Sequence, residues 1–483
     1  MDPELKFVSG NSYRDAPEYD VQGGGAHDRT ADVAVNSRPG INIVGNASAY
    51  MGLGTVAREF AKALQARGHP VAVHDLDAGA GRSGSDHSLR ALFVPDITAL
   101  PHGLTLWVIG ADSLPYVARR ICQEPALRRA RNAACVWWEL PDVPPTYRAA
   151  AMAFDALVTG SEFMRDAWLM AASDRPVLLA PQPLDMPDDV SPDRERFGLD
   201  PAATIFYCGF ETISDPVRKN PFGAVDAFKR AFPGTEAVQL AIKVNNPDGR
   251  GRRGELLARL YSLIGDDPRV VLIRERLAPQ DVLSLYASCD VTVSLHRSEG
   301  LGLMPLEGMR LGVPSIATGW SGNITYMTDS GAALVRYALV PNDESCAHYA
   351  PRNVGVLSRW AEPDLDHAAS WMRRLQESPD LRHRLAATAK RDALAYDARA
   401  RRLDFMEELA AIAAEPHGSA ADDPTTILTQ LREAEFEKEL FGRSRLYAQL
   451  RRLHAGLRRR AGQLRQRFTQ PLARSKSVRD GSS

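Results

Sequence analysis

Residues 294–323 read SLHRSEGLGLMPLEGMRLGVPSIATGWSGN, and this stretch decides the fold of the chain. The β-branched run 291–293 just before it is typical of a buried parallel strand. We expect a helix with Pro305 as its first residue, because the N–H that proline lacks would be unpaired there in any case. Gly312, followed by Pro314, is expected to end that helix. This order of strand, glycine-rich turn and helix predicts one unit of an α/β sheet.

Two acids flank the expected helix start: Glu299 lies in the turn and Glu307 in the predicted first helical turn. A helix N-terminus presents unpaired N–H groups and partial positive charge, so it suits a phosphate. Carboxylates beside an anion would repel it unless they accept hydroxyl donors, which sugars and riboses supply. The acids therefore suit a ligand with hydroxyls on both sides of a diphosphate. In the alternative interpretation, Glu307 only complements the helix dipole and Glu299 is a solvated loop acid.

The pattern Glu299-GLGLMPL-Glu307, followed by GMRLGVPSIAT and GWSGN, resembles the E-x7-E signature of the retaining family 4 glycosyltransferases, which have the GT-B fold. The resemblance covers about residues 40–410. It implies that Glu299 lies beside the donor sugar and that Glu307 holds the ribose hydroxyls of a nucleotide sugar. It also implies that backbone amides meet the sugar and the distal phosphate at Gly300, Leu301, Gly302 and Leu303.

The bulk properties are those of an ordinary soluble protein. Its 483 residues are enough for two or three domains. The composition, with 44% hydrophobic and 25% charged residues, is typical of soluble proteins. Its net charge of −1 gives no support for nucleic-acid binding. The five scattered cysteines argue for a reducing compartment and against a zinc site. The sequence shows no long apolar run and no signal-peptide pattern, so we predict a cytoplasmic protein.

The first 190 residues are expected to hold a disordered leader, 1–39, and an N-terminal Rossmann-like domain, 40–190. The domain opens with a strand, 41–44, and a turn of small residues that includes Gly52 and Gly54. Taken alone, such a turn is compatible with plain strand–helix packing. The resemblance places it in the interdomain cleft near the donor, which makes the two glycines candidates for donor binding.

Three more apolar segments predict parallel strands of this domain: 104–109, 133–138 and 156–159. Ligands of open α/β sheets bind beyond the carboxyl ends of the strands, and Glu139 follows such an end. The Trp-Trp-Glu-Leu-Pro segment resembles a subgroup of these transferases, whereas many other relatives have a histidine there. Glu139 is either an acceptor contact or a structural cap.

A second Rossmann-like domain, 191–378, is expected on the nucleotide-sugar side. After its first strand, 204–209, the next turn carries Arg218 and Lys219, and an ammonium there would neutralise a diphosphate leaving group. The resemblance supports Lys219 as the family's lysine and Arg218 as its partner cation. The sequence departs from the family in having Phe210 directly after the strand glycine. The alternative is a solvated basic pair.

The rest of this domain supplies one more candidate. By the resemblance, the loop after strand 270–273 lines the base pocket, so that Arg276 and Leu277 would border the base. We interpret His296 as a packed strand-end histidine, because no second histidine is spaced for a shared metal. No metal site and no cofactor other than the donor substrate is expected.

The C-terminal part is expected to contain crossover helices, 379–415, and then a linker with a basic helical tail, 416–483. Apolar residues with heptad-like spacing mark the tail: Leu446, Leu450, Leu453, Leu457, Leu464 and Phe468. Three interpretations stay open. The tail docks on an anionic membrane surface or a partner, self-associates as a coiled coil, or is an exposed helix. The first would place the protein on the inner face of the membrane.

Together these features predict a GT-B protein of two Rossmann-like domains with a cleft between them and a helical C-terminal extension. The resemblance implies transfer of a hexose-type sugar, with retention, from a nucleoside diphosphate sugar to a glycan or lipid-linked acceptor hydroxyl. It also implies a role in polysaccharide or glycolipid assembly. Catalysis would depend on Lys219, Arg218, Glu299 and positioning. Two alternatives remain: a GT-B nucleotide-sugar epimerase, and a non-catalytic GT-B binding or scaffold protein.

Overall fold

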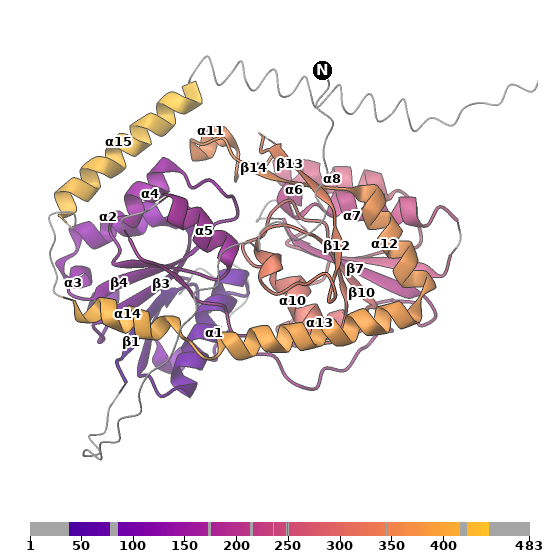
Figure 1. The fold of residues 1–483 in the computed structure, drawn as a ribbon, viewed down its shortest axis with the longest axis horizontal. Helices are drawn as coiled ribbons and strands as arrows, with labels where there is room; N and C mark the ends of the chain where they lie inside the picture. The colour runs from indigo at the N-terminus through magenta and orange to yellow at the C-terminus, as the bar shows by residue number, and fades with distance from the viewer. Residues whose placement is uncertain are drawn as a thin grey trace, which may run out of the picture.

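The computed structural model describes residues 38–443 except 78–85, 172–174, 213–215, 235, 248, 250, 344, 347 and 416–422. The expected leader up to residue 37 and the apolar stripe of the tail lie outside the described residues. The described chain forms two α/β domains that face one another, with three C-terminal helices around them (Figure 1).

The N-terminal domain contains a six-stranded parallel sheet in the order β2-β1-β3-β4-β5-β6. Its strands are almost entirely buried, as expected for apolar segments with helices on both faces. The strands are β1 (Ile41–Gly45), β2 (Val71–Asp75), β3 (Leu104–Gly110), β4 (Arg131–Trp137), β5 (Ala156–Thr159) and β6 (Val177–Leu179). The helices are α1 (Gly52–Ala66), α2 (Leu114–Gln123), α3 (Pro125–Arg128), α4 (Pro145–Ala151) and α5 (Glu162–Ala171).

The C-terminal domain has its own six-stranded parallel sheet in the order β12-β11-β10-β7-β8-β9. Its strands are β7 (Thr204–Glu211), β8 (Val238–Asn245), β9 (Val270–Ile273), β10 (Val291–Ser294), β11 (Ser315–Thr318) and β12 (Ala333–Val335). Its helices are α6 (Pro216–Lys219), α7 (Pro221–Ala231), α8 (Arg252–Ile264), α9 (Pro279–Ala287), α10 (Leu303–Arg310) and α12 (Leu365–Glu377). The strand order reverses between β7 and β10, which is the position where doubly wound sheets bind ligands.

An antiparallel pair, β13 (Tyr337–Pro341) and β14 (Arg359–Pro363), lies outside both large sheets. The segment between its strands contains the short helix α11 (Pro351–Val354) and reaches the N-terminal domain. The sequence did not predict this segment as a unit.

The chain then returns to the first domain. Helix α13 (Pro379–Ala400) packs against α10 and leads across to α14 (Phe405–Ala414), where Phe405 meets Phe60 of α1 with ring centroids 5.6 Å apart (Figure 1). The prediction of two Rossmann-like domains with a helical C-terminal extension is confirmed.

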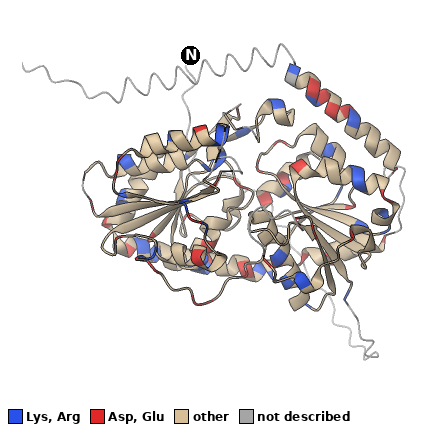
Figure 2. Cartoon of the chain, turned by 180° about the vertical axis from the view of Figure 1, so that it is seen from behind, with Lys and Arg blue, Asp and Glu red and all other residues tan. Residues whose placement is uncertain are grey.

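The last described helix, α15 (Pro424–Arg443), joins the two domains. It packs against α4 and α2 of the N-terminal domain and against α11 of the C-terminal domain. Leu431 is fully buried in this contact, and Glu435 forms a 2.5 Å ion pair with Arg119 of α2. Charges of both signs lie along the helix (Figure 2). The helix therefore holds one domain against the other.

Candidate functional site

The topology brings the predicted cations and the first predicted acid together. Arg218 and Lys219 follow β7, and Glu299 follows β10, so all three residues lie beyond the carboxyl ends of adjacent parallel strands. Arg218 and Glu299 are 81 positions apart in the sequence, and they meet because the two strands that they follow are neighbours where the strand order reverses. This is the position at which we expected the donor site.

Glu299 forms ion pairs with both cations. Lys219 Nζ lies 2.5 Å from Glu299 Oε1, and Arg218 Nη1 lies 3.1 Å from Glu299 Oε2. Burial alone would raise the pKa of Glu299, but the two cations outweigh burial and lower its pKa to about 2. Arg218 is buried, whereas the Lys219 side chain is 28% exposed. The alternative of a solvated basic pair therefore does not describe Arg218, and Lys219 is the cation that a ligand can reach.

The acidic turn has a fixed backbone. The N–H of Glu299 donates to Ser321 Oγ at 2.9 Å, and the N–H of Gly322 donates to the Glu299 carbonyl oxygen at 2.9 Å. A Cβ at position 322 would lie 2.0 Å from the Gly300 carbonyl oxygen, so only glycine fits there. From the other domain, Ser161 Oγ donates a 2.6 Å hydrogen bond to that same Gly300 oxygen. The turn is thus positioned from two sides.

The helix after the turn begins earlier than predicted. Helix α10 starts at Leu303, so the prediction that Pro305 is its first residue is wrong. Gly302 precedes the helix with a φ of +88°, a left-handed conformation that favours glycine, and its carbonyl oxygen accepts a hydrogen bond from the Tyr326 hydroxyl at 2.6 Å. Pro305 is tolerated as the third helical residue because the first four N–H groups of a helix have no intrahelical partner.

Glu307 consequently lies in the second turn of α10, not in the first turn as predicted. Burial raises the pKa of its carboxyl group to about 7, and a hydrogen bond from the Tyr286 hydroxyl partly offsets this effect. Leu277, the predicted neighbour of the base, belongs to the same apolar cluster as Tyr286 and Met304. Leu277 therefore lies in the apolar cluster that contains Tyr286, the residue that donates a hydrogen bond to Glu307.

The two candidate glycines of the first domain differ from each other. A Cβ on Gly54 would lie 2.2 Å from the Ala49 carbonyl oxygen and 2.7 Å from the Asn46 carbonyl oxygen, so local packing explains this glycine. A Cβ on Gly52 would meet no atom within 4 Å. Among the contacts of the described residues, none links either glycine to the acidic turn.

Sequence reasoning missed most of the contacts that the N-terminal domain makes with the site. The ring of Trp137 lies 3.1 Å from where a Gly300 Cβ would be, beside Met164. Glu139 accepts a 2.5 Å hydrogen bond from the hydroxyl of Tyr349, a residue of the β13–β14 segment. The Trp-Trp-Glu motif pointed to Glu139, and Ser161 follows the carboxyl end of the predicted strand 156–159, but no pattern in the sequence indicated Tyr349.

His296 is fully buried beneath the site. Burial lowers its pKa to about 4, so the ring is neutral at pH 7. Among the described residues, no group of three or more His, Cys, Asp or Glu side chains is placed to hold a metal ion. Within the same part of the chain, no helix is both long enough and apolar enough to cross a membrane.

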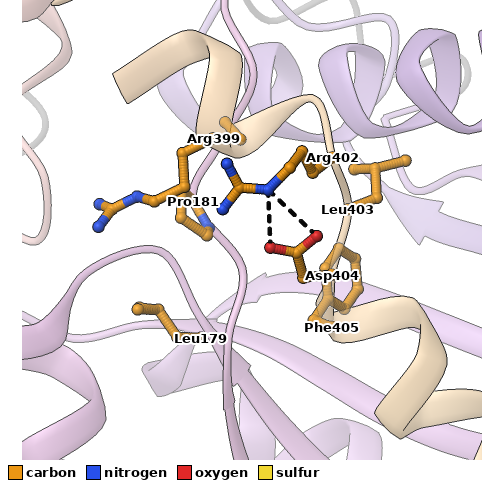
Figure 3. A pocket seen from close by; sticks show the side chains of 8 residues that line it. Leu179, Pro181, Arg399, Arg402, Leu403, Asp404 and Phe405 are labelled. Atoms are coloured by element: carbon orange, nitrogen blue, oxygen red, sulfur yellow. Dashed lines mark hydrogen bonds and ion pairs between the residues drawn. The ribbon is translucent and has the colours of Figure 1, made fainter. Parts of the chain in front are cut away.

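A small cavity lies where the chain passes between the domains, away from the predicted site residues (Figure 3). Its volume is about 90 Å³, well below the roughly 300 Å³ of a small-molecule site. It is lined by Leu179, Pro181, Arg399, Ala400, Arg402, Leu403, Asp404 and Phe405, with Arg402 paired to Asp404 at 3.0 Å. This position marks the interdomain crossing and not a nucleotide site.

Comparisons with known proteins find a family match over part of the chain. Residues 221–351, which include the acidic turn, match the model of the family described as glycosyl transferases group 1. Among curated proteins, the D-inositol 3-phosphate glycosyltransferase of Rhodococcus jostii is 28% identical over 142 residues, or 28% of this chain and 30% of the relative. The enzyme of the same name from Acidothermus cellulolyticus is 24% identical over 257 residues, or 50% of this chain and 53% of the relative. The chain thus spans about half or less of these relatives.

Solved structures extend the comparison over both domains. Anabaena HepE, solved with UDP and glucose, is 16% identical and superposes with a TM-score of 0.53 over 77% of this chain and 100% of its own. Sucrose-phosphate synthase from Thermosynechococcus elongatus is 17% identical, with a TM-score of 0.56 over 78% of this chain and 100% of its own. At these identities the likeness concerns the fold alone. The chain has the GT-B fold, and the segment that carries its acidic turn matches the group 1 glycosyl transferases.

Proposed function

We propose that this protein transfers a sugar from a nucleoside diphosphate sugar to an acceptor hydroxyl, with retention at the anomeric carbon. The observation that carries the proposal is the joint pairing of Lys219 and Arg218 with Glu299 at the point where the strand order reverses. A non-catalytic scaffold would not need a buried carboxylate whose pKa two cations hold at about 2.

The residues divide the work as follows. The ammonium of Lys219 has three N–H donors, so it can keep Glu299 and still stabilise the negative charge of a departing diphosphate. The N–H groups of Leu303 and Met304, at the start of α10, have no intrahelical acceptor and would meet phosphate or sugar oxygens. Glu307 would accept hydrogen bonds from the ribose hydroxyls.

The leaving group would depart from the face on which the acceptor attacks, and the protein would contribute positioning and charge stabilisation. This mechanism needs no metal and no cofactor besides the donor. We also propose that the reaction serves polysaccharide or glycolipid assembly in the cytoplasm, because the resemblance first seen in the sequence implies it.

The first experiment is a thermal-shift screen of UDP-, GDP- and ADP-sugars. A ligand at 100 times its Kd stabilises the folded state by about 2.7 kcal/mol, which is easily seen as a rise in Tm. UDP-glucose comes first, because HepE was solved with UDP and glucose. Glu307→Ala serves as the control, because it should reduce the shift. If no nucleotide sugar raises the Tm of the wild-type protein, the proposal is wrong.

The second experiment uses the donor found in the screen with and without acceptor. D-inositol 3-phosphate is a reasonable first acceptor, because the curated relatives are named for it. A glycosylated product that forms only with acceptor supports transfer, and the retained anomer is read by NMR. A product that forms without acceptor indicates an epimerase, and donor binding without any turnover indicates a binding protein.

A further inference from the structure

One carboxylate of the N-terminal domain, that of Glu139, reaches the buried cation Arg218 of the C-terminal domain. Glu139 Oε1 lies 4.0 Å from Arg218 Nη2, and Glu139 Oε2 accepts the 2.5 Å hydrogen bond from the Tyr349 hydroxyl. The backbone oxygen of Glu139 also accepts a hydrogen bond from Ser298, the residue before the acidic Glu299. Glu139 of the N-terminal domain therefore contacts three separate segments of the C-terminal domain.

Tyr349 completes the enclosure of Arg218. Its ring centroid lies 5.6 Å from the guanidinium carbon of Arg218, within the range of a cation–π contact. The same ring packs against Trp138, with centroids 5.4 Å apart. Burial and the nearby Glu139 keep the pKa of Tyr349 well above its usual value, so its hydroxyl remains a donor at every physiological pH.

Arg218 has fixed partners within its own domain as well. Its Nη1 donates a 2.8 Å hydrogen bond to the Ser298 carbonyl oxygen and lies 3.1 Å from Glu299. A buried guanidinium is sensitive to the arrangement of the charges around it, because little solvent screens them. Glu139 is the carboxylate that the N-terminal domain adds to this arrangement. The environment of Arg218 is therefore complete only when the domains are together.

We propose that Glu139 and Tyr349 are positioning residues, which orient Arg218 for the nucleoside diphosphate and make the donor site depend on contact between the two domains. This inference rests on the proposed function. It also assigns Glu139 a role other than binding the acceptor.

The structure offers a matched control. Ser358 Oγ donates a 2.7 Å hydrogen bond to Asp142, so it joins the same two segments across the domain interface. In the described contacts, neither residue touches Arg218. Loss of the Ser358 hydroxyl removes a partly buried interdomain hydrogen bond of the same kind but leaves the surroundings of the guanidinium intact.

The experiment measures the affinity for UDP by titration calorimetry in the full chain. We expect Tyr349→Phe and Glu139→Ala each to weaken UDP binding about ten-fold, and Ser358→Ala to stay within two-fold of the wild type. In an Arg218→Lys background, Tyr349→Phe should cause no further loss, because it acts through the guanidinium. Thermal unfolding of each variant confirms that it is folded.

The outcomes separate the two proposals. If the wild type binds neither UDP nor GDP nor ADP, the proposed function is wrong, and the positioning role falls with it. If the wild type binds UDP but Tyr349→Phe and Ser358→Ala weaken binding equally, only the positioning role is wrong. An undiminished effect of Tyr349→Phe in the Arg218→Lys background would also overturn it. That result does not depend on the control, so the role remains testable even if Glu139→Ala fails to fold.

Discussion

Ser161 of the N-terminal domain donates a 2.6 Å hydrogen bond to the carbonyl oxygen of Gly300 in the acidic turn of the C-terminal domain. Both groups are fully buried, and the residues are 139 positions apart in the sequence. The turn that we propose to meet the donor sugar is therefore in direct contact with the opposite domain. Properties of the donor site should respond to changes on both sides of this contact.

The raised pKa of Glu307 predicts that nucleotide binding depends on pH. Its pKa of about 7 lies above the value of an unfolded glutamate, so the carboxyl ionises as the pH rises from 6 to 8. In the ionised form both carboxylate oxygens accept from the ribose hydroxyls, whereas protonation turns one oxygen into a donor, and the ionised fraction grows about ten-fold over this range. Calorimetry should show a similar gain in nucleoside diphosphate affinity, after correction for ionisation of the nucleotide.

Glu307→Gln is the control for this prediction, since the amide does not titrate. The raised pKa of Glu307 should also make the stability of the ligand-free protein fall as the pH rises. The folded state holds this proton more tightly than the unfolded state does, so the free energy of unfolding should fall between about pH 4.5 and pH 7. A nucleotide affinity that changes equally with pH in wild type and Glu307→Gln would contradict the assignment.

Replacement of Lys219 should affect turnover more than binding. Lys219→Ala removes the partly exposed cation that pairs with Glu299, and loss of a preorganised charge stabiliser typically lowers kcat by about 10²-fold or more. Lys219→Arg serves as the charge-conserving comparison. Steady-state kinetics with the donor found in the screen give the measurement. A near-normal kcat in Lys219→Ala would move the role to Arg218.

Removal of Glu299 should destabilise the protein strongly. Glu299→Ala leaves Arg218 buried without its main counter-charge, and breaking a buried pair from one side costs about 3–5 kcal/mol. Asp281→Ala, which breaks the surface pair with Arg196, should cost about 0–1 kcal/mol. Urea unfolding of both variants tests the contrast. If both variants lose the same free energy of unfolding, burial does not make the Glu299 pair more stabilising than a surface pair.

The fit of Gly322 under the acidic turn predicts a steric effect. In Gly322→Ala, the new Cβ would lie 2.0 Å from the Gly300 oxygen, so backbone atoms must move, at a cost of about 1–3 kcal/mol. Gly52→Ala, at the open first position of α1, should instead raise stability by about 0.4–1 kcal/mol. Thermal unfolding distinguishes the two. An unchanged Tm in Gly322→Ala would mean that the turn is not held as tightly as its contacts indicate.

The predicted membrane role of the basic tail has a sharper test now that α15 is defined. A deletion that starts at Thr425 would remove the buried Leu431, whereas a chain that ends at Arg443 keeps α15 whole. If the tail docks on an anionic membrane surface, the full chain, but not the shortened one, sediments with phosphatidylserine vesicles at low salt. Neutral phosphatidylcholine vesicles are the control. A full chain that stays in the supernatant would contradict the membrane interpretation, and light scattering would then test self-association.

The sheets could be predicted because their strands are continuous apolar segments. The segments 156–159 and 270–273 were predicted with the bounds that β5 and β9 have in the structure. The start of α10 was wrong by two residues, because the left-handed Gly302 lets the helix begin ahead of Pro305. Local sequence patterns therefore predict the bounds of apolar strands, but they do not determine the residue at which a helix begins after a left-handed glycine.

The sequence predicted only part of the candidate site, because the rest depends on contacts between the two domains. The acidic turn and the basic pair have local signatures, so Glu299 and Lys219 could be proposed from the sequence. The hydrogen bond from Tyr349 to Glu139 joins residues 210 positions apart, and its existence depends on how two domains meet. A motif drew attention to Glu139, but nothing in the periodicity or composition around Tyr349 indicates that the two residues meet.

Helix α15 has a consequence for how the protein is made. Domains fold as units during synthesis, with the N-terminal part first, but α15 leaves the ribosome after both domains have been translated. Until then, the apolar face of α2 and α4 that Leu431 covers remains open to solvent. A growing chain therefore exposes this apolar face to solvent from the synthesis of α4 until the synthesis of α15.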